Sequence, residues 1–461
     1  MRSQILAALV LSALVGSSAA AAPLGLAWGV VAEPATAGAH TPGQMAEHLE
    51  FLQAHGWRAV RSRDLGGAEL GERSVLLGFD DPASALRYVV PLLDLYQMPA
   101  VVTVGPAQAA DPAFAPVLKD LAASPWVELL PRVEREPGAE GAPAVRCEAG
   151  AVDPAARERE TLARLSRTLA DQVARLREVT GVAPVGAVWA PGAWSGAGER
   201  VAAGLGLTVQ LPTFTGMPPW LDPPRIARYA VPSWAGVWAL VQASVHWDPQ
   251  NLPVRFVEVD AAWVCGGGDP GARVARVVEV VRRLGLNGVR LLPGGPAGAW
   301  FPTTAAPVRG DVVGPLAQAL HDAGVRWVVV DLPIPSGNPG RDVTLVTDLA
   351  RAVDVDLVVL PAASRPEDRL GEAVLSVRPA ARLAWRDGGG AGERAFHLAP
   401  LTPGRQASRG LTVAATTVAA ADAEAASRAV AGWDWIGLPV DLAEAGLAVS
   451  LRSLAAFALP R

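Results

Sequence analysis

Two adjacent aspartates, Asp80 and Asp81, carry the clearest chemical signal in the sequence, because they directly follow the apolar run Ser74–Phe79. A short run rich in Val and Leu without helical period predicts a buried strand of a parallel sheet, and chemistry collects at the carboxyl ends of such strands. Neighbouring carboxylates repel unless they share a cation or a proton, so such a pair often supplies one metal ligand and one base. The alternative is an ordinary turn in which Asp81 starts the next helix.

Alternating helices and strands surround this pair and predict an α/β fold. A helix is expected to begin near Thr41, which Pro42 follows, and to end at Gly56. After the aspartates we expect a helix at 86–95, a strand at 100–104, a helix at 114–121, a strand at 127–130, a helix at 154–181 and a strand at 185–190. Repeated units of this kind build a parallel barrel or an open sheet.

The second half of the chain repeats this alternation, which predicts a second (β/α) barrel in tandem with the first. We expect strands at 254–260, 288–292, 325–331, 357–360 and 435–440, and helices at 274–284, 312–320 and 343–352. Pro-rich stretches at 218–224 and 248–253 bracket the join. The predicted segments are therefore 1–22, a first domain at 23–250 and a second domain at 251–461.

The composition favours a globular protein and excludes a nucleic-acid partner. Hydrophobic residues make up 51% of the 461 residues and charged residues 18%, with 47 Gly and 40 Pro, which fits α/β architecture with many short loops. The net charge is −5 and no long basic run occurs, so we expect no nucleic acid among the partners.

The first 22 residues have the layout of a secretory signal peptide. Arg2 precedes the apolar stretch Ile5–Val15 and an Ala-rich end that offers a cleavage site after Ala22. A short membrane anchor is the alternative, but the apolar stretch is shorter than the ~20 residues that a membrane span needs. We expect a soluble protein that is secreted across the inner membrane into the periplasm. No cysteine lies near the cleavage site to carry a lipid anchor.

The chain has two cysteines, Cys147 and Cys265. An oxidising compartment permits a disulfide between them. Because they lie in different predicted domains, 23–250 and 251–461, we expect that they do not form one.

The first half resembles the polysaccharide deacetylase domain of carbohydrate esterase family four. The resemblance rests on the strand that ends in Phe79-Asp80-Asp81, and on Trp189 and Gly192 after a long amphipathic helix. It implies that Asp80 is the general base and that Asp81 is a ligand of a divalent zinc, cobalt or nickel ion. It also implies that Trp189 and Gly192 line the substrate groove. An active enzyme of this kind would hydrolyse carbohydrate N-acetyl bonds.

The other metal ligands of that family are missing here. The family has two histidines just after its third strand, where this chain has Arg132 and Pro137. Zinc and cobalt favour imidazole nitrogen, and an arginine does not deprotonate to bind them. Glu134 is the one nearby candidate for an oxygen ligand, and the six histidines of the chain lie elsewhere, at positions 40, 48, 55, 246, 321 and 397. Deacetylation by the family mechanism would therefore need a different ligand set.

The second half resembles the glycoside-hydrolase-like domain of the PgaB-type poly-β-1,6-N-acetylglucosamine N-deacetylases. The matching pieces are Val257–Asp260, and Ala299–Pro302 followed by Asp311 and a helix. In that family the two linked domains deacetylate an exported polymer and bind or cleave the product, which implies an outer-membrane export protein as a partner. Where the family supplies its hydrolytic acid this chain has Val359–Ala363, although a glycosidase needs two carboxyl groups.

Tryptophans and strand-end acids remain as candidates for sugar binding. The chain has 15 Trp against 3 Tyr, and an indole face stacks on the C–H face of a pyranose. Seven residues at or just after predicted strand ends are expected to bind the polymer: Trp189, Trp194, Trp263, Trp300, Glu258, Asp260 and Asp331. The alternatives are core packing for the tryptophans and ordinary loop positions for the acids.

Two functional hypotheses follow. The chain is a periplasmic deacetylase that acts on an N-acetylglucosamine polymer in exopolysaccharide (biofilm) export, or it is a catalytically inactive scaffold that binds the polymer during export. A third hypothesis is an unrelated structural protein on two barrels, because fold does not fix function. A cluster of Glu134 with Asp80 and Asp81 would favour the enzyme, and a Trp-lined groove without a metal cage would favour the scaffold.

Overall fold

The computed structural model describes two compact units of the chain, one formed by 1–134, 167–191 and 202–247 and the other by 135–166, 192–201 and 248–461. Within them the described residues are 23–34, 36–66, 70, 73–134, 145–148, 153–214, 221, 224–233, 236–237, 240, 254–284, 286–295, 298–325, 327–332, 338–361, 369–379, 381–386, 394–398, 412–417 and 435–439. The predicted signal peptide, residues 1–22, lies outside the described residues.

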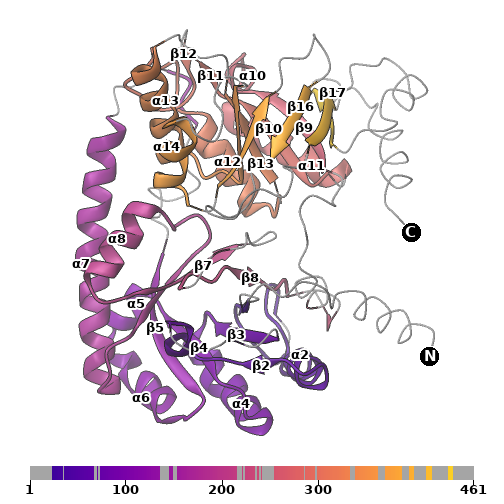
Figure 1. The fold of residues 1–461 in the computed structure, drawn as a ribbon. Coiled ribbons are helices and arrows are strands. Elements are labelled where there is room, and N and C mark those ends of the chain that lie inside the picture. The colour runs from indigo at the N-terminus through magenta and orange to yellow at the C-terminus, as the bar shows by residue number, and fades with distance from the viewer. Residues whose placement is uncertain are drawn as a thin grey trace, which may run out of the picture. The chain divides into compact units, whose positions relative to one another are not determined.

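Among the described residues of the first unit, seven parallel strands close into a barrel (Figure 1). In ring order they are β1 (Leu24–Trp28), β8 (Arg228–Ala230), β7 (Val209–Phe214), β6 (Gly186–Trp189), β5 (Val127–Val133), β4 (Ala100–Val104) and β3 (Ser74–Phe79), and β3 pairs back with β1. A short strand, β2 (Arg58–Ala59), pairs with β3 outside the ring. The four strands predicted for the first half, at β3, β4, β5 and β6, are confirmed.

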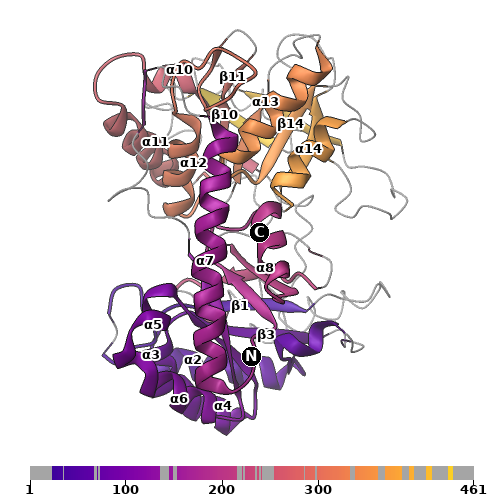
Figure 2. The ribbon, with the colours of Figure 1, turned by 90° about the vertical axis from the view of Figure 1, so that its left-hand side faces the viewer.

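Helices follow the strands of the first unit. They are α2 (Pro42–Ala54), α3 (Pro82–Ser84), the π-helical turn η2 (Ala85–Val89), α4 (Val90–Tyr96), α5 (Pro106–Ala110) and α6 (Ala115–Ala123), with short 3-10 turns at η1 (Ser62–Gly66) and η3 (Pro112–Phe114). The helices predicted at 41–56, 86–95 and 114–121 are confirmed as α2, α4 and α6. The helices α7 (Pro154–Thr180) and α8 (Gly196–Gly204) each contribute residues to both units. Figure 2 shows α7 as one continuous helix.

The start and end of α2 follow from local chemistry. Thr41 Oγ1 accepts a hydrogen bond from the N–H of Gln44 at 3.1 Å, and Gln44 Oε1 accepts one from the N–H of Thr41 at 2.8 Å. These two bonds satisfy donors that the first turn of a helix leaves unpaired. Beyond the helix Gly56 adopts φ +73°, a conformation that favours glycine. The predicted helix is confirmed.

Alternate residues of the barrel strands fill two separate cores. Successive side chains of a barrel strand point inward and outward in turn. One buried cluster contains Leu76, Val101, Leu130, Val188 and Leu211. The sequence neighbours of these residues pack instead with the surrounding helices in a second cluster, which includes Leu77, Val102, Leu129, Leu49 and Leu93. The first cluster is therefore the barrel interior, and the inward series continues at its carboxyl end with Asp80, Thr103 and Arg132.

Gly78, on β3, makes room inside this barrel for the buried side chain of Arg228. A Cβ atom at Gly78 would lie 3.0 Å from Arg228 Nη1 and 3.2 Å from the carbonyl oxygen of Leu26. Neither neighbour can move away freely, because the arginine is fully buried and the carbonyl belongs to β1. The apolar strand before Asp80 therefore contains a glycine for a steric reason.

We expect Gly78→Ala to lower the free energy of unfolding by about 1–3 kcal/mol, the usual cost of overpacking a filled interior. Gly204→Ala is the matched control, because nothing lies within 4 Å of a Cβ atom at that position in α8. Urea unfolding of both variants measures the difference. Equal stability of Gly78→Ala and the unmodified chain would contradict the steric argument.

In the second unit the strands pair in the order β9 (Val254–Asp260), β10 (Gly288–Leu292), β13 (Trp327–Asp331), β14 (Leu357–Pro361), β15 (Arg382–Arg386), β16 (Arg394–Leu398), β17 (Thr412–Thr417) and β18 (Trp435–Pro439), and β18 pairs back with β9. We call this set the second-unit ring. The strand β16 runs antiparallel to both of its neighbours. The ring therefore differs from an all-parallel (β/α) barrel, and its likeness to a glycoside hydrolase stays a prediction.

Helices connect the parallel strands of this ring. They are α10 (Ala261–Val264), α11 (Pro270–Leu284), α12 (Val313–Asp322), α13 (Pro339–Ala352) and α14 (Arg369–Val377), and a small hairpin of β11 (Gly294–Gly295) and β12 (Gly298–Ala299) follows β10. The helices and strands predicted for the second half are confirmed, with ends that differ by a few residues. The sequence did not predict α10, α14, the hairpin or β15–β17.

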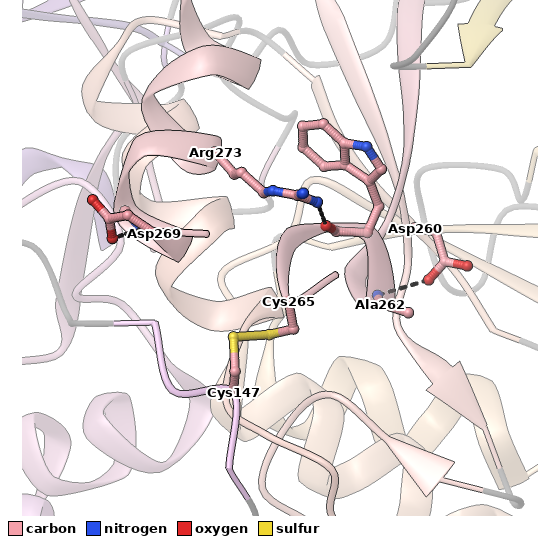
Figure 3. The surroundings of a disulfide bond; sticks show 8 residues. Cys147, Asp260, Ala262, Cys265, Asp269 and Arg273 are labelled. Atoms are coloured by element: carbon pink, nitrogen blue, oxygen red, sulfur yellow. Dashed lines mark hydrogen bonds between the residues drawn. A yellow bond between two sulfur atoms is a disulfide. The ribbon is translucent and has the colours of Figure 1, made fainter. Parts of the chain in front are cut away.

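Cys147 and Cys265 form a disulfide (Figure 3), so the expectation that they do not pair is wrong. The physical reason is that segment 135–166 belongs to the second unit, as Cys265 does. The two Cα atoms are 5.5 Å apart, in the usual range for a disulfide. Beside the disulfide, Arg146 and Asp311 exchange two main-chain hydrogen bonds at 3.0 and 2.8 Å. Both contacts hold the segment around Cys147 within the second unit.

None of the described helices is both long enough and apolar enough to span a lipid bilayer.

Candidate functional site

Asp80 lies at the carboxyl end of β3, where two side chains hold one oxygen of its carboxylate. Arg228 Nη2 donates to Oδ1 at 2.7 Å, and Thr103 Oγ1 donates to the same oxygen at 3.2 Å. The side chain of Arg228 is fully buried, whereas that of Asp80 is 17% exposed. The arginine therefore compensates the charge of Asp80 and fixes the carboxylate at the mouth of the first-unit barrel.

Arg132 reaches the same place from β5. Its Nη1 atom donates to the main-chain carbonyl of Asp80 at 3.4 Å. Its own carbonyl accepts a hydrogen bond from Gln172 Nε2 of α7 at 3.1 Å, which fixes the strand below it. The guanidinium of Arg132 thus joins that of Arg228 at the mouth of the first-unit barrel.

Asp81 caps the helix that follows β3, as in the alternative interpretation of the sequence. Its Oδ2 atom accepts a hydrogen bond from the N–H of Ser84 at 2.9 Å, and its carbonyl accepts one from Ser84 Oγ at 3.3 Å. The same Ser84 hydroxyl accepts a hydrogen bond from the N–H of Val31 at 3.1 Å, which joins the cap to the segment after β1. The carboxylate of Asp81 thus has a structural task.

The described residues do not fit the zinc, cobalt or nickel ion of the family. Nowhere in the described part of the chain do three His, Cys, Asp or Glu side chains come together in a group that could hold a metal ion. Glu134 is exposed and does not complete such a group with Asp80 and Asp81. The described side chains around Asp81 therefore do not support a metal-dependent reaction.

Two buried histidines near β1 were not singled out in the sequence. Trp28 Nε1 donates to His48 Nδ1 at 3.2 Å, and His40 Nε2 lies 3.2 Å from the carbonyl oxygen of Pro232. Their ring centroids are 6.2 Å apart. Burial lowers the pKa of His40, against a smaller opposing effect of the Pro232 carbonyl. Both histidines are buried and belong to the core of the first unit.

The structure places Trp189 in the core and not in a groove. It has no exposed surface, and its Nε1 atom donates to the buried Gln210 Oε1 at 2.8 Å. Gly192 follows in a turn with φ +75°. Trp194 is 6% exposed, and its carbonyl accepts a hydrogen bond from Arg378 Nη1 at 3.1 Å. Neither indole therefore has a face open to a pyranose. Both residues instead pack in the core, which is the alternative that the sequence left open.

Glu258 and Asp331 come together inside the second-unit ring through Arg290. Arg290 Nη1 donates to Glu258 Oε2 at 2.8 Å, and Nη2 donates to Asp331 Oδ2. The side chain of Asp331 is fully buried, that of Arg290 is 5% exposed and that of Glu258 is 21% exposed. Burial lowers the pKa of Arg290, and the charge of Glu258 opposes this effect. We call these three residues the buried triad.

The other predicted sugar-binding residues of this unit do not join the triad through any described contact. Asp260 Oδ1 accepts a hydrogen bond from the N–H of Ala262 at 2.8 Å and so caps α10. The guanidinium of Arg273 lies 4.9 Å from the ring centroid of Trp263 (Figure 3). Trp300 is half-buried against the main hydrophobic core of the unit. Trp263 and Trp300 thus keep part of their surface available.

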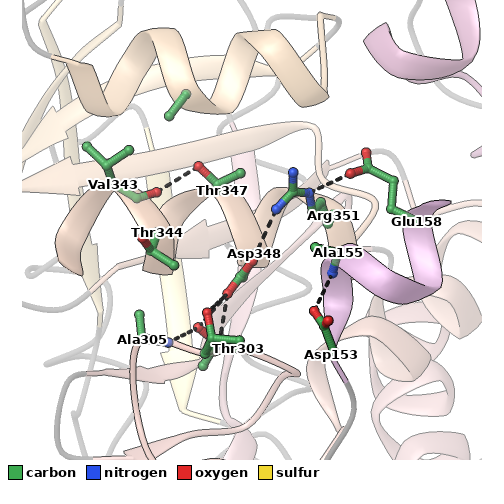
Figure 4. Close-up of polar contacts among 12 residues, drawn as sticks. Asp153, Ala155, Glu158, Thr303, Ala305, Val343, Thr344, Thr347, Asp348 and Arg351 are labelled. Carbon is green, nitrogen blue, oxygen red and sulfur yellow. Dashed lines mark hydrogen bonds and ion pairs between the residues drawn. The ribbon is translucent and has the colours of Figure 1, made fainter. Parts of the chain in front are cut away.

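A separate polar network fixes the loop after the hairpin. Thr303 Oγ1 and the N–H of Thr304 donate to the buried Asp348 at 3.0 and 2.9 Å, and Arg351 Nε donates to Glu158 Oε2 at 2.8 Å (Figure 4). An open hollow of about 480 Å³ lies nearby, and none of the predicted site residues lines it; its lining is Thr304, Ala305, Ala306, Pro307, Gly340, Arg341 and Thr344.

Arg228 and Arg290 are the residues of the two candidate sites that were not predicted from the sequence. Arg228 stands in the apolar stretch Ile226–Val231, and Arg290 stands in Gly288–Leu292. A single charge inside a buried strand is rarely tolerated without a partner, so each arginine predicts a carboxylate on a neighbouring strand. This signal was available before the structure.

No protein-family model matches the chain, and no curated protein is similar to it in sequence. Solved structures of polysaccharide deacetylases are similar to about half of it. The de-N-acetylase from Aggregatibacter actinomycetemcomitans is 16% identical with a TM-score of 0.39, over 47% of this chain and 98% of that one. The BpsB deacetylase domain from Bordetella bronchiseptica is 21% identical with a TM-score of 0.33, over 45% and 95%. IcaB from Ammonifex degensii is 16% identical with a TM-score of 0.36, over 49% and 99%.

A further solved structure, the PgaB (BpsB) glycoside hydrolase domain from Bordetella bronchiseptica, is 16% identical with a TM-score of 0.21, over 24% of this chain and 44% of that one. At these identities and TM-scores the similarity by itself assigns neither an activity nor a substrate to this chain.

Proposed function

We propose that this chain is a scaffold that binds an N-acetylglucosamine polymer during exopolysaccharide export and does not deacetylate it by a metal-dependent reaction. The observation that carries the proposal is the position of Arg132. Its guanidinium contacts the main chain of Asp80 at the barrel mouth, where the family has a metal-binding histidine.

The chemistry of amide hydrolysis supports this choice over the enzyme. A metal ion polarises the carbonyl and lowers the pKa of a bound water, so that a nearby carboxylate can act as the base. Arg132 can donate a hydrogen bond to a carbonyl, but it cannot coordinate a water molecule as zinc does. Asp80 also compensates the buried charge of Arg228. Among the described residues the mouth thus retains polar groups for binding, and no group of metal ligands is present there to generate the nucleophile.

The setting of this function follows from the sequence. The segment 1–22 resembles a secretory signal, so we place the mature chain in the periplasm, with an outer-membrane export protein as a partner. In the second unit, Glu258, Trp263 and Trp300 keep exposed surface and are the residues that we propose for polymer contact there.

The test measures acetate release and binding in the same samples. Purified protein is mixed with β-1,6-linked N-acetylglucosamine oligomers, with and without zinc, cobalt or nickel, next to the Asp80→Asn variant. We expect the oligomers to bind and no acetate to appear under any condition. Metal-dependent acetate release that disappears in Asp80→Asn would establish the deacetylase instead. Absence of binding would refute the scaffold.

A further inference from the structure

His321, near the end of α12, lies between two carboxylates of the turn that precedes β14. Its Nε2 atom is 3.0 Å from Asp356 Oδ2, and its Nδ1 atom is 3.5 Å from Asp354 Oδ2. The side chain of His321 is 13% exposed, and those of Asp356 and Asp354 are 28% and 29% exposed. Each nitrogen of the ring therefore faces its own carboxylate in a mostly buried place.

This cluster lies at the amino ends of two strands of the second-unit ring. The N–H of Val328, the second residue of β13, donates to Asp356 Oδ2 at 2.7 Å, and the N–H of Asp356 donates to the carbonyl of Val328 at 3.0 Å. Asp331 of the buried triad stands at the other end of β13. In (β/α) folds the amino ends of the strands serve stability. The cluster is thus distinct from the buried triad.

Arg378, just after α14, connects the cluster to the segment 192–201. Its Nη1 atom lies 3.6 Å from Asp354 Oδ1 and donates to the carbonyl of Trp194 at 3.1 Å. By its contacts the segment 192–201 belongs to the second unit, as Arg378 does. A chain of polar contacts therefore runs within the second unit from His321 through Asp354 and Arg378 to this segment.

Only a protonated ring donates to both carboxylates. A neutral imidazole has one N–H donor and one lone pair, so one of the two aspartates would face the lone pair. An imidazolium donates from both nitrogens, one to Asp354 and one to Asp356. Loss of the proton removes one of these bonds, and it also removes a positive charge from beside two carboxylates that are largely withdrawn from water.

Two further charged residues of the described chain lie beside the cluster. Arg382 donates its main-chain N–H to the carbonyl of Asp356 at 2.9 Å, and its guanidinium lies over the ring of Trp327, 4.8 Å from the centroid. Asp322 follows His321 at the end of α12. The negative charge of Asp322 favours a protonated ring, as the two facing carboxylates do.

We propose that His321 is a pH sensor of the second unit. The protonated ring holds both aspartates and, through Asp354, supports the grip of Arg378 on the segment 192–201, whereas the neutral ring releases one carboxylate. A histidine of the unfolded chain titrates at about pH 6.5. The stabilisation is therefore complete below that pH and is lost as the pH rises through the titration of the folded ring. This device does not depend on the polymer.

Urea unfolding at about pH 6 and about pH 8.5 tests the sensor. We expect the urea midpoint of the unmodified protein to fall by roughly 0.5 M over this range. His321→Gln carries no charge at either pH, so its midpoint should change much less. Every other histidine titrates in both proteins, and the difference between the two pH dependences therefore reports His321 alone.

Two further variants make the result interpretable, also if His321→Gln folds poorly. In Asp354→Asn the new amide can donate to Nδ1 of a neutral ring, which keeps its Nε2 proton for Asp356, so most of the pH dependence should disappear. His55→Gln is the matched control and should keep the full dependence. The ring of His55 contacts the carbonyl of Phe51 at 2.8 Å and pairs with no carboxylate among the described residues.

Hydrogen exchange at the same two pH values, corrected for the intrinsic exchange rates, follows the segments 192–201 and 353–356 directly. We expect both segments to exchange faster at the higher pH in the unmodified protein, and at nearly equal corrected rates in Asp354→Asn. The proposal is overturned if His321→Gln or Asp354→Asn keeps the pH dependence of the unmodified protein. Exchange of either segment that does not respond to pH in the unmodified protein would overturn it as well.

Discussion

Arg290→Met is expected to lower the free energy of unfolding by about 3–5 kcal/mol, the cost of removing one partner from a buried ion pair. The guanidinium bridges Glu258 and Asp331 inside the second-unit ring, and the side chain of Asp331 has no exposed surface. Methionine fills a similar volume but removes the cation that bridges the two carboxylates. Their repulsion and the lost solvation act in the same direction.

Urea unfolding followed by tryptophan fluorescence and circular dichroism measures this effect. Arg276→Met is the control, because Arg276 pairs with Glu279 on the outside of α11 and is 37% exposed. Its loss should cost less than about 1 kcal/mol. Adding Glu258→Gln to Arg290→Met removes one of the two carboxylates and should restore part of the stability. An Arg290→Met protein as stable as the Arg276→Met control would show that the triad does not need its cation.

Breaking the disulfide between Cys147 and Cys265 is the second change for which we expect a large effect. The cysteines are 118 residues apart. In the chain-entropy account, closing a loop of about 100 residues stabilises the folded state by about 4.7 kcal/mol, and removal of a native disulfide typically costs about 2–5 kcal/mol. The double variant Cys147→Ser with Cys265→Ser should show a loss in that range.

The measurement compares urea midpoints of the unmodified protein with and without dithiothreitol. The double serine variant provides the control, since reductant should leave its midpoint unchanged. The unmodified protein should fall to the midpoint of the variant when it is reduced. If the oxidised and reduced proteins unfold at the same urea concentration, the disulfide does not stabilise the second unit.

Local signals in the sequence were sufficient for about half of the described elements of the fold. The cap at Thr41 and the glycine at Gly56 fix the two ends of α2, and the Val- and Leu-rich run Ser74–Phe79 fixes β3. Such signals act between residues that are neighbours along the chain, so they do not depend on the tertiary structure. The helix-capping role of Asp81 belongs to the same class and was the alternative that the sequence left open.

Contacts between distant residues were harder to predict. The disulfide was missed because the sequence was divided at one point, whereas the structure takes 135–166 into the second unit. The partner of Asp80, Arg228, is 148 residues away along the chain. Trp189 was expected in a groove because it ends a strand. Whether such a residue faces water depends on the tertiary structure that covers it, and Trp189 is covered by Gln210 and other core residues. Strand ends therefore locate a site without identifying its residues.

Because the segment 135–166 belongs to the second unit, part of that unit is synthesised before the first unit is complete. Cys147 is translated before β6, β7 and β8 of the first unit, yet it must wait for Cys265, which follows after those strands. Neither unit therefore consists of one uninterrupted stretch of chain that can finish folding before the next begins. A fragment cut at residue 250 would leave one unpaired cysteine in each piece, and the piece 251–461 would lack Arg146, which forms an isolated antiparallel bridge with Asp311. Each unit is thus assembled from segments that are not contiguous in the sequence.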